Sequence, residues 1–310
     1  MSKPKALLIT HPARLGDTIL SIPLHRTLAA NYDLHSNAGE PYRFLFQELE
    51  GQITFTDPQA PKTLGEILKR AKELQSQNFQ TCFILRPSFR SALLAKLAKI
   101  PQRVGECTEG RGFLLTHKLP YSPNMPEFER MDAFAQLVNL TTDKTATLPA
   151  SPDSIAKAQA ALQGATIGIV PGGTWPQKLI PTETLRRTIH HLVEQGYRVA
   201  MLGGPGDEIY CKPLAKEPVV DLVAKFKLSE MAGVLHSLNL LITPDGGLSH
   251  LSVACGTPAL IAFGPTPHLR WGHHEPPHKT IVAPGSQMDR LTWAEFQPHV
   301  DEMLAMIANP

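Results

Sequence analysis

The chain has 310 residues, of which 42% are hydrophobic and 19% charged, and its formal net charge is +2. This length allows two ordinary domains, each with its own buried core. The small net charge and the scattered Lys and Arg residues argue against a nucleic-acid-binding protein. The apolar runs are much shorter than the roughly 20 residues of a membrane-spanning helix, and the first residues lead into a strand instead of a signal-peptide core. We therefore expect a cytoplasmic protein.

The N-terminal half predicts alternating strands and helices. Apolar, strand-like runs span 5–10, 33–35, 53–56, 81–85 and 103–106. Helical patterns span 18–31, 41–49, 63–77, 89–97 and 128–140. Such alternation is typical of a doubly wound parallel sheet. The loop after the first strand contains only Gly16 and lacks the G-x-G-x-x-G spacing, which argues against a dinucleotide-dependent dehydrogenase.

Polar residues lie at two helix starts in this half. Asp17 precedes the helical pattern that begins at Thr18, where an N-cap is the ordinary interpretation. Arg86, Ser88 and Arg90 lie between a strand and the following helix, and such a group could bind an anion. Two solvated arginines beside a capping serine would give the same pattern. Both interpretations stay open on these residues alone.

A stretch rich in Thr, Pro, Ala and Ser, 141–152, predicts a linker. A second alternating series follows it. Its strands are expected at 165–170, 197–202, 219–222, 240–243 and 259–263, and its helices at 182–195, 228–235, 248–255 and 292–307. The sequence therefore predicts an α/β protein with two doubly wound domains that face each other across a cleft.

Three polar loops follow strands of the second series, at 171–178, 203–208 and 244–247, and parallel strands place such loops on one edge of the sheet. Their glycines would let backbone N–H groups approach a diphosphate closely, and Lys178 would neutralise charge on a leaving group. Each loop alone also fits an ordinary tight turn. His250, one turn into the helix after Asp245, could bind a phosphate or be a buried structural histidine.

Candidates for acid-base chemistry are few. Asp17 lies in the first half, and Asp207, Glu208 and Asp245 lie in loops of the second. A carboxylate across a cleft from a phosphate site is a natural general base. The chain has no D-x-D pair, which argues against a divalent metal that holds a nucleotide, and its adjacent histidine pairs lack the spacing of a zinc site.

Several segments together resemble the lipopolysaccharide heptosyltransferases, the ADP-heptose-using glycosyltransferase family 9. The segments are RLGDTILSIP (14–23), RPSFRSALL (86–94), GTWPQKLIP (173–181), LGGPGD (202–207), DGGLSH (245–250) and GPT (264–266). They occur in the order of the family and extend over nearly the whole chain. Each is short, and the ordered set carries the resemblance.

The resemblance implies the GT-B architecture, with two Rossmann-like domains. The acceptor domain would span 1–150 and the nucleotide-sugar domain 151–290, and a last helix within 291–310 would cross back to the first domain. It also implies an inverting, metal-independent transfer of heptose to the inner core of lipopolysaccharide. The acceptor would be a lipid A-Kdo molecule. ADP-heptose would be a substrate, so no cofactor is expected. Membrane contact would be peripheral, on the inner face of the inner membrane.

The resemblance also implies roles for single residues. Asp17 would take the proton of the acceptor hydroxyl, and Lys178 would stabilise the departing diphosphate. Residues implied to bind the donor are Gly172, Gly173, Thr174, Lys178, Glu208, Met231, Asp245, Gly246, Gly247, Leu248 and His250. Residues implied to bind the acceptor are Arg14, Arg86, Ser88 and Arg90. No residue is assigned to a metal.

One departure from the family pattern keeps alternatives open. Gly246 stands where family members usually carry Ser or Thr, so a hydroxyl that would meet the sugar or phosphate is missing. A nucleotide-sugar epimerase or hydrolase on the same scaffold would use the same phosphate loops without an acceptor. A non-catalytic nucleotide-sugar-binding protein would bind the donor without turnover.

Overall fold

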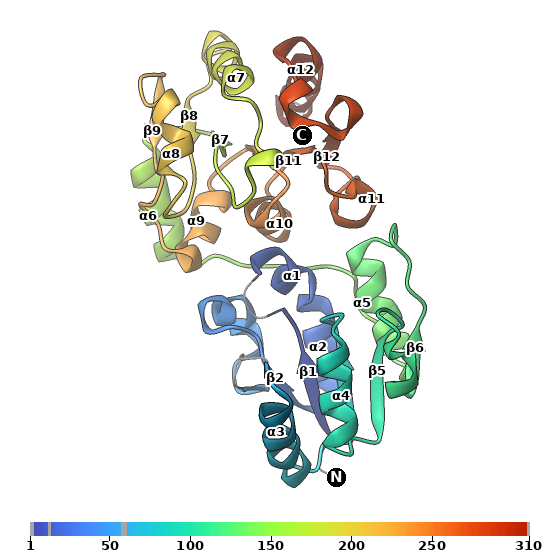
Figure 1. Cartoon of the computed structure of the whole chain (residues 1–310). Helices are drawn as coiled ribbons and strands as arrows, with labels where there is room; N and C mark the ends of the chain where they lie inside the picture. The colour runs from blue at the N-terminus through green and yellow to red at the C-terminus, as the bar shows by residue number, and fades with distance from the viewer. Residues whose placement is uncertain (1–2, 12–13, 57–60, 309–310) are drawn as a thin grey trace. The chain divides into compact units, whose positions relative to one another are not determined.

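The computed structural model describes residues 3–11, 14–56 and 61–308. The chain divides into two compact units, Met1–Ala146 and Thr147–Pro310 (Figure 1). The division falls within the stretch 141–152, for which the composition predicts a linker. Each unit contains a parallel sheet with helices on both faces.

The described residues of the first unit form a six-stranded sheet in the order β3-β2-β1-β4-β5-β6. The strands are β1 (Lys5–Ile9), β2 (Asp33–Ser36), β3 (Ile53–Phe55), β4 (Thr81–Ile84), β5 (Gln102–Glu106) and β6 (His117–Leu119). Every pairing is parallel, and Ala6 of the central strand is in register with Leu34 on one side and Thr81 on the other. The α-helices are α1 (Leu15–Leu20), α2 (Ile22–Asn31), α3 (Leu64–Ser76), α4 (Phe89–Leu97) and α5 (Glu127–Gln136), and the 3-10 helices are η1 (Glu40–Leu49) and η2 (Arg111–Leu114).

The second unit repeats this strand order. Its described residues form a six-stranded parallel sheet in the order β12-β11-β10-β7-β8-β9. The strands are β7 (Ile167–Ile169), β8 (Val199–Met201), β9 (Val219–Asp221), β10 (Leu240–Pro244), β11 (Ala259–Phe263) and β12 (His278–Val282). The main helices are α6 (Pro152–Leu162), α7 (Thr182–Glu194), α8 (Glu208–Cys211), α9 (Met231–His236), α10 (Gly247–Ala254), α11 (His268–Trp271) and α12 (Trp293–Ala308). In both units the strand order is that of the Rossmann fold.

Alternation along each strand builds two core layers in the first unit. Leu7 and Ile84 belong to the layer formed with α3 and α4, whereas Leu8 and Phe83 belong to the layer formed with α2 and α5. Because successive side chains of a strand point to opposite faces, a strand covered on both faces must be apolar throughout. This explains why the central strands read as unbroken apolar runs, and it confirms the predicted doubly wound sheets.

Some predicted elements differ from the structure. The helix expected at 18–31 is two helices, α1 and α2, which meet at Ser21. Pro23 has no N–H to donate to the preceding turn, so one continuous hydrogen-bond ladder cannot run through this point. The helix expected at 41–49 is the 3-10 helix η1. Neither α6 nor β12 was predicted from the sequence.

The last helix, α12, packs against α7 and β11 of its own unit. Phe296, Val300 and Met303 are buried in the core of that unit. The implied return of this helix to the first domain stays a prediction. Within the described part of the chain, no helix has both the length and the apolar composition that crossing a bilayer requires.

Candidate active site

Each sheet has one switch point, where the chain changes direction across the sheet. It lies between β1 and β4 in the first unit and between β7 and β10 in the second. Ligands of open α/β sheets bind outside the carboxyl ends of the strands at such a point. The loop that leads to Asp17 and the loop containing Arg86 and Ser88 follow β1 and β4. The loops containing Lys178 and Asp245 follow β7 and β10.

Lys178 and Asp245 form an ion pair across the switch point of the second unit. Lys178 Nζ lies 2.7 Å from Asp245 Oδ2, and the hydroxyl of Thr266 donates to the same oxygen over 2.7 Å. The Lys178 ammonium also lies 4.9 Å from the ring centre of Trp175, a cation–π distance. Asp245 is only 7% exposed, so loops after three neighbouring strands fix a lysine and a carboxylate in one place. Thr266 was not among the predicted site residues, although its segment belongs to the resemblance.

The glycine loop after β7 packs directly on Asp207. A Cβ atom at Gly172 would lie 2.5 Å from the Asp207 carboxylate, so no larger residue fits there without movement. Asp207 Oδ2 accepts a hydrogen bond from the Gly204 N–H over 2.8 Å, which closes its own glycine loop. Gly173 has a φ of +157°, a conformation that favours glycine. Asp207 is therefore a structural residue of the loops in this arrangement.

Gly246 and Gly247 begin the helix α10. Gly246 is fully extended, with φ 179°, a conformation open to any residue. A Cβ there would meet only the Pro244 carbonyl oxygen, at 4.0 Å. Ser249 caps the helix, because its hydroxyl accepts from the Gly246 N–H and donates to the Gly246 carbonyl. The backbone therefore leaves room for the hydroxyl side chain that this chain lacks at position 246.

His250 is buried in α10 and shares a hydrogen bond with a second histidine. Its Nδ1 lies 2.9 Å from Nε2 of His273, which follows α11. Burial, together with the charges of the neighbouring His250, His278 and His274, lowers the pKa of His273 to about 2. His273 is therefore neutral at working pH, and this bond fixes the orientation of the His250 ring. The sequence did not indicate His273 as a site residue: its pair with His274 lacks the spacing of a zinc site, and nothing else in the pattern marked it.

The remaining predicted donor residues lie around this group in different environments. Thr174 is exposed and Leu248 is half-buried. The exposed Glu208 accepts a hydrogen bond from the Gly206 N–H over 2.6 Å, so its carboxylate lies on its own glycine turn. Met231 is the first residue of α9 and is only 3% exposed. In the described part of the chain, no group of three or more His, Cys, Asp or Glu side chains is arranged to hold a metal ion.

Asp17 lies in the first turn of α1, which begins at Leu15. The N-cap position is occupied by Arg14, so the interpretation of Asp17 as the N-cap is wrong. Burial raises the pKa of the Asp17 carboxyl above its ordinary value of 3.8, the charge of Arg14 lowers it, and the charge of Glu127 raises it. The carboxylate is therefore a stronger base than an exposed aspartate.

Three arginines lower the pKa of His11, which follows β1. Burial, together with the charges of Arg14, Arg86 and Arg130, lowers the pKa of His11 to about 4. His11 is thus neutral at neutral pH and lies in a positive environment. Two of the predicted acceptor residues, Arg14 and Arg86, contribute to this environment.

The start of α4 differs from its prediction. Ser88 occupies the N-cap position but makes no side-chain cap hydrogen bond. Instead, the carboxylate of Glu109 accepts a hydrogen bond from the Phe89 N–H over 3.2 Å. Arg90 is exposed and donates to the Lys62 carbonyl over 3.4 Å. At this helix start, where anion binding and an ordinary serine cap were both open, a carboxylate of the protein itself accepts the hydrogen bond.

A buried ionic group that was not predicted from the sequence supports this edge of the first sheet. Arg130 of α5 donates to Glu106 at the end of β5 over 3.3 Å, to Glu127 over 3.1 Å and to the Leu85 carbonyl over 2.9 Å. All three charged side chains are at most 5% exposed. The i,i+3 spacing of Glu127 and Arg130 was visible in the sequence, but their burial was not.

Two Rossmann-like units, each with polar loops at its switch point, are the architecture of GT-B glycosyltransferases. Residues 67–294 match the sequence pattern of Glycosyltransferase family 9 (heptosyltransferase), and the chain belongs to that family. This finding confirms the resemblance stated from the sequence, and it makes the protein an enzyme of the glycosyltransferase type.

Individual relatives agree with this assignment. The chain is 27% identical to lipooligosaccharide heptosyltransferase 2 of Haemophilus influenzae, over 84% of this chain and 83% of the relative. Its fold matches the structure of E. coli ADP-heptose lps heptosyltransferase II with a TM-score of 0.74 at 21% identity, covering 98% of each chain. It also matches an E. coli heptosyltransferase solved with ADP-2-deoxy-2-fluoro heptose, with a TM-score of 0.66 at 20% identity, covering 96% of this chain and 99% of the other.

Proposed function

We propose that this enzyme transfers a heptose from ADP-heptose to the inner core of lipopolysaccharide. The relative from Haemophilus influenzae bears the name of such a transferase, and a structural neighbour was solved with an ADP-heptose analogue. The observation that carries the proposal is the Lys178–Asp245–Thr266 group at the switch point of the second unit. It combines a cation for a diphosphate with hydrogen-bonding groups for a sugar.

In the reaction, Asp17 is the general base. Its carboxylate takes the proton of the acceptor hydroxyl, and the acceptor oxygen attacks the anomeric carbon of the heptose. The bond from that carbon to the diphosphate oxygen breaks, and ADP leaves with the electron pair. Attack on the face opposite to the leaving group inverts the anomeric configuration. The raised pKa of Asp17 supports this role, because it strengthens the base.

Lys178 stabilises the negative charge that grows on the departing diphosphate. Further hydrogen-bond donors to the diphosphate are the N–H groups of Gly172 and Gly173 and those at the start of α10. His250, in α10, would bind the diphosphate from the same direction. These groups supply the stabilisation that a divalent cation supplies in other transferases. We therefore propose a metal-independent transfer, which requires that activity persists in excess EDTA.

Arg14 and Arg86 bind the anionic acceptor. Their charges already act together on His11, so the environment at the end of β1 attracts a negatively charged group. A lipid A-Kdo acceptor supplies carboxylates and phosphates, which arginine binds in a bidentate manner. The acceptor hydroxyl would then be presented to Asp17, which follows the same strand.

The test is ADP release from ADP-heptose with and without a Kdo-bearing lipid A acceptor. We expect release that depends on the acceptor and a product larger by one heptose. Asp17→Asn should reduce kcat by a factor on the order of 100 to 10,000 while ADP still binds, because only the base is lost. Transfer at the normal rate by folded Asp17→Asn would refute the role of Asp17. Heptose or an epimer formed without acceptor would instead indicate a hydrolase or epimerase, and ADP-heptose binding without turnover would indicate a binding protein.

A further inference from the structure

The first unit exposes large apolar side chains on and beside two helices. Phe113 in η2 is 66% exposed and Phe89 at the start of α4 is 39% exposed. On α3, Leu64 is 62% exposed and Leu68 is 46% exposed. Single exposed apolar residues are ordinary on a protein surface, whereas a connected group of them calls for a partner.

Contacts connect these residues into one surface. The rings of Phe89 and Phe113 have centres 6.2 Å apart, and Lys96 of α4 lies 5.6 Å above the Phe113 ring. Arg90, next to Phe89, donates to the carbonyl of Lys62, two residues before Leu64. Leu64 and Leu68 are four residues apart on α3, so they share one helix face. We call Leu64, Leu68, Phe89 and Phe113, with Lys62, Arg90 and Lys96, the docking face.

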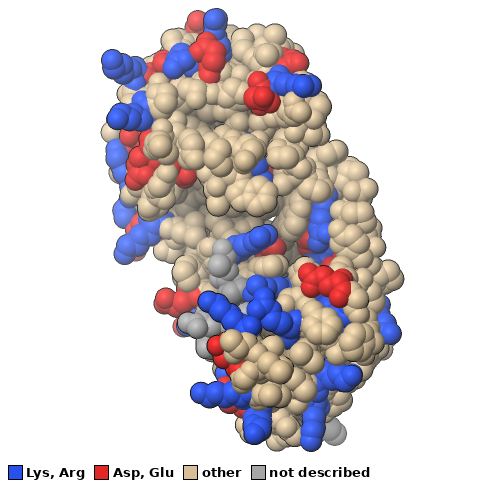
Figure 2. Space-filling model, viewed as in Figure 1, with Lys and Arg blue, Asp and Glu red and all other residues tan. Residues whose placement is uncertain are grey.

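Charge is distributed very unevenly around the docking face. Residues 61–118 contain 11 Lys and Arg but only four Asp and Glu, although the whole chain has a net charge of only +2. Figure 2 shows Lys and Arg side chains gathered over α3 and α4 of this unit. The basic character is therefore local to the part of the chain that carries the exposed apolar residues.

The four acidic residues of 61–118 are already bound within the unit. Glu66 accepts from the N–H groups of Lys62 and Thr63 at the start of α3, and Glu73 pairs with Arg70. Glu106 is bound to Arg130, and Glu109 caps α4, as described above. With these carboxylates counted, residues 61–118 still carry an excess of seven positive charges.

We propose that the docking face binds the surface of a lipid bilayer that contains anionic lipids. Apolar side chains that project beside lysines suit the boundary between head groups and acyl chains, because the rings enter the apolar layer while the ammonium groups stay at the phosphates. A nucleic acid would use the charge but would leave Leu64 and Leu68 exposed. This inference assigns a particular surface to the peripheral membrane contact that the resemblance implies, and it takes the lipid-linked acceptor of the proposed function as given.

The test is binding of the purified full-length protein to vesicles without any sugar donor or acceptor. We expect binding to vesicles of phosphatidylcholine and phosphatidylglycerol at 3:1, and much weaker binding to phosphatidylcholine alone or at 1 M salt. Phe113→Ser should weaken binding about tenfold, and Lys96→Ser about fivefold. The protein should keep its unfolding temperature and its transfer to a detergent-solubilised acceptor in both variants.

Matched controls come from the second unit. Ile209 is 72% exposed and Lys216 is exposed, so Ile209→Ser and Lys216→Ser remove similar groups elsewhere on the surface. Both variants should bind vesicles like the unaltered protein. The proposal is overturned by absence of binding to the anionic vesicles, or by equal losses in Phe113→Ser and Ile209→Ser. Losses in Lys96→Ser without any loss in Phe113→Ser would also overturn it, because they would indicate a surface that recognises polyanions by charge alone. None of these outcomes bears on the proposed transfer reaction, because ADP release and heptose transfer are measured in a separate assay.

Discussion

At the scale of single residues, charges of opposite sign act on Asp17, with Arg14 and Glu127 the largest of them. Arg14 lowers the pKa of the Asp17 carboxyl and Glu127 raises it, against a background of burial that raises it. A general base must be deprotonated, so the rate falls as pH falls through this pKa. The position of the acidic limb of the kcat/KM profile therefore depends on the charges of Arg14 and Glu127.

We predict opposite shifts for two charge-removing variants. Arg14→Gln should move the acidic limb of the kcat/KM profile to higher pH, because the carboxylate loses a stabilising cation. Glu127→Gln should move it to lower pH, because a repelling charge is lost. Each shift should be a fraction of a pH unit to about one unit. Shifts of the same sign in both variants would contradict a base at Asp17.

Two glycines of the second unit should tolerate substitution very differently. Gly172→Ala would force its Cβ against the Asp207 carboxylate and should cost about 1–3 kcal/mol. Gly246→Ser meets open space and should change stability by less than about 0.5 kcal/mol. Chemical denaturation of both variants checks this, and a destabilised Gly246→Ser would show that the extended backbone at this position needs glycine after all.

The sequence supplied the site residues one by one but not their partners. Lys178 and Asp245 were each expected on the same sheet edge, yet nothing in a separation of 67 residues predicts that they form an ion pair. The burial of Arg130 was equally hidden, because a Glu and an Arg on an amphipathic helix usually face solvent. Asp17 was placed at the right loop, and only its position within the first turn of the helix was wrong.

At the scale of secondary-structure elements, Arg130 joins β4, β5 and α5 through buried bonds. Arg130→Met should destabilise the first unit by about 3–5 kcal/mol, since Glu106 and Glu127 would be left buried without their cation. Urea unfolding measures the loss. A variant as stable as the unaltered chain would show that the carboxylates reach water or take up protons instead.

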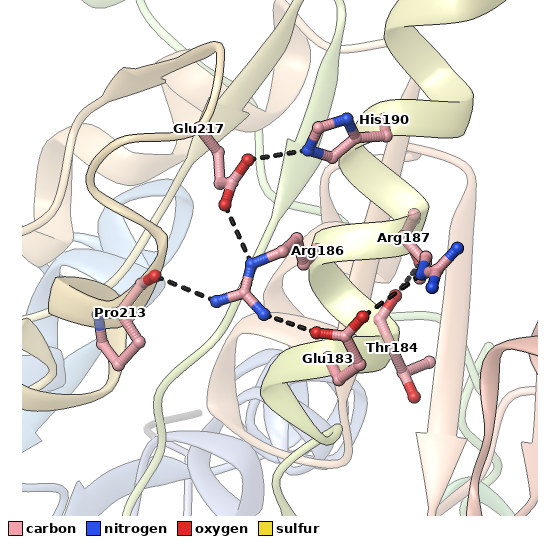
Figure 3. A network of polar contacts seen from close by, with 8 residues as sticks. Glu183, Thr184, Arg186, Arg187, His190, Pro213 and Glu217 are labelled. Carbon is pink, nitrogen blue, oxygen red and sulfur yellow. Dashed lines mark hydrogen bonds and ion pairs between the residues drawn. The ribbon is translucent and has the colours of Figure 1, made fainter.

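The surface network of α7 gives the matched control. Figure 3 shows Arg186 bound by Glu183, by Glu217 and by the Pro213 carbonyl, with His190 also bound to Glu217. Exposed ion pairs contribute little because water and salt screen them. The Glu183 side chain is 63% exposed, so Glu183→Gln should leave the unfolding midpoint and the transfer rate almost unchanged.

Sequence periodicity located most elements to within a few residues, and its errors have physical causes. The predicted α3 and α12 segments nearly coincide with the observed helices, because their apolar positions recur at helical spacing. β12 was missed because His278 and Lys279 interrupt the apolar pattern of an edge strand. The 3-10 form of η1 depends on local hydrogen bonding that no apolar pattern encodes.

At the scale of the whole molecule, each unit has a hydrophobic core of its own. We therefore predict two calorimetric unfolding transitions. ADP at about 100 times its Kd should stabilise only the transition of the second unit, by about 2.7 kcal/mol. Scanning calorimetry with and without ADP tests this, and Arg130→Met identifies the transition of the first unit. A shift of the first unit's transition by ADP would contradict the proposal that the second unit alone binds the nucleotide.

The pairing of Lys178 with Asp245 also has a consequence for turnover. In the structure, the ammonium that would hold the diphosphate already has a carboxylate partner 2.7 Å away. After transfer, we expect this carboxylate to compete with ADP for the lysine, so that the enzyme itself helps to expel its product. Many enzymes are limited by that step. The same aspartate would thus help to receive the sugar at the start of a catalytic cycle and to empty the site at its end.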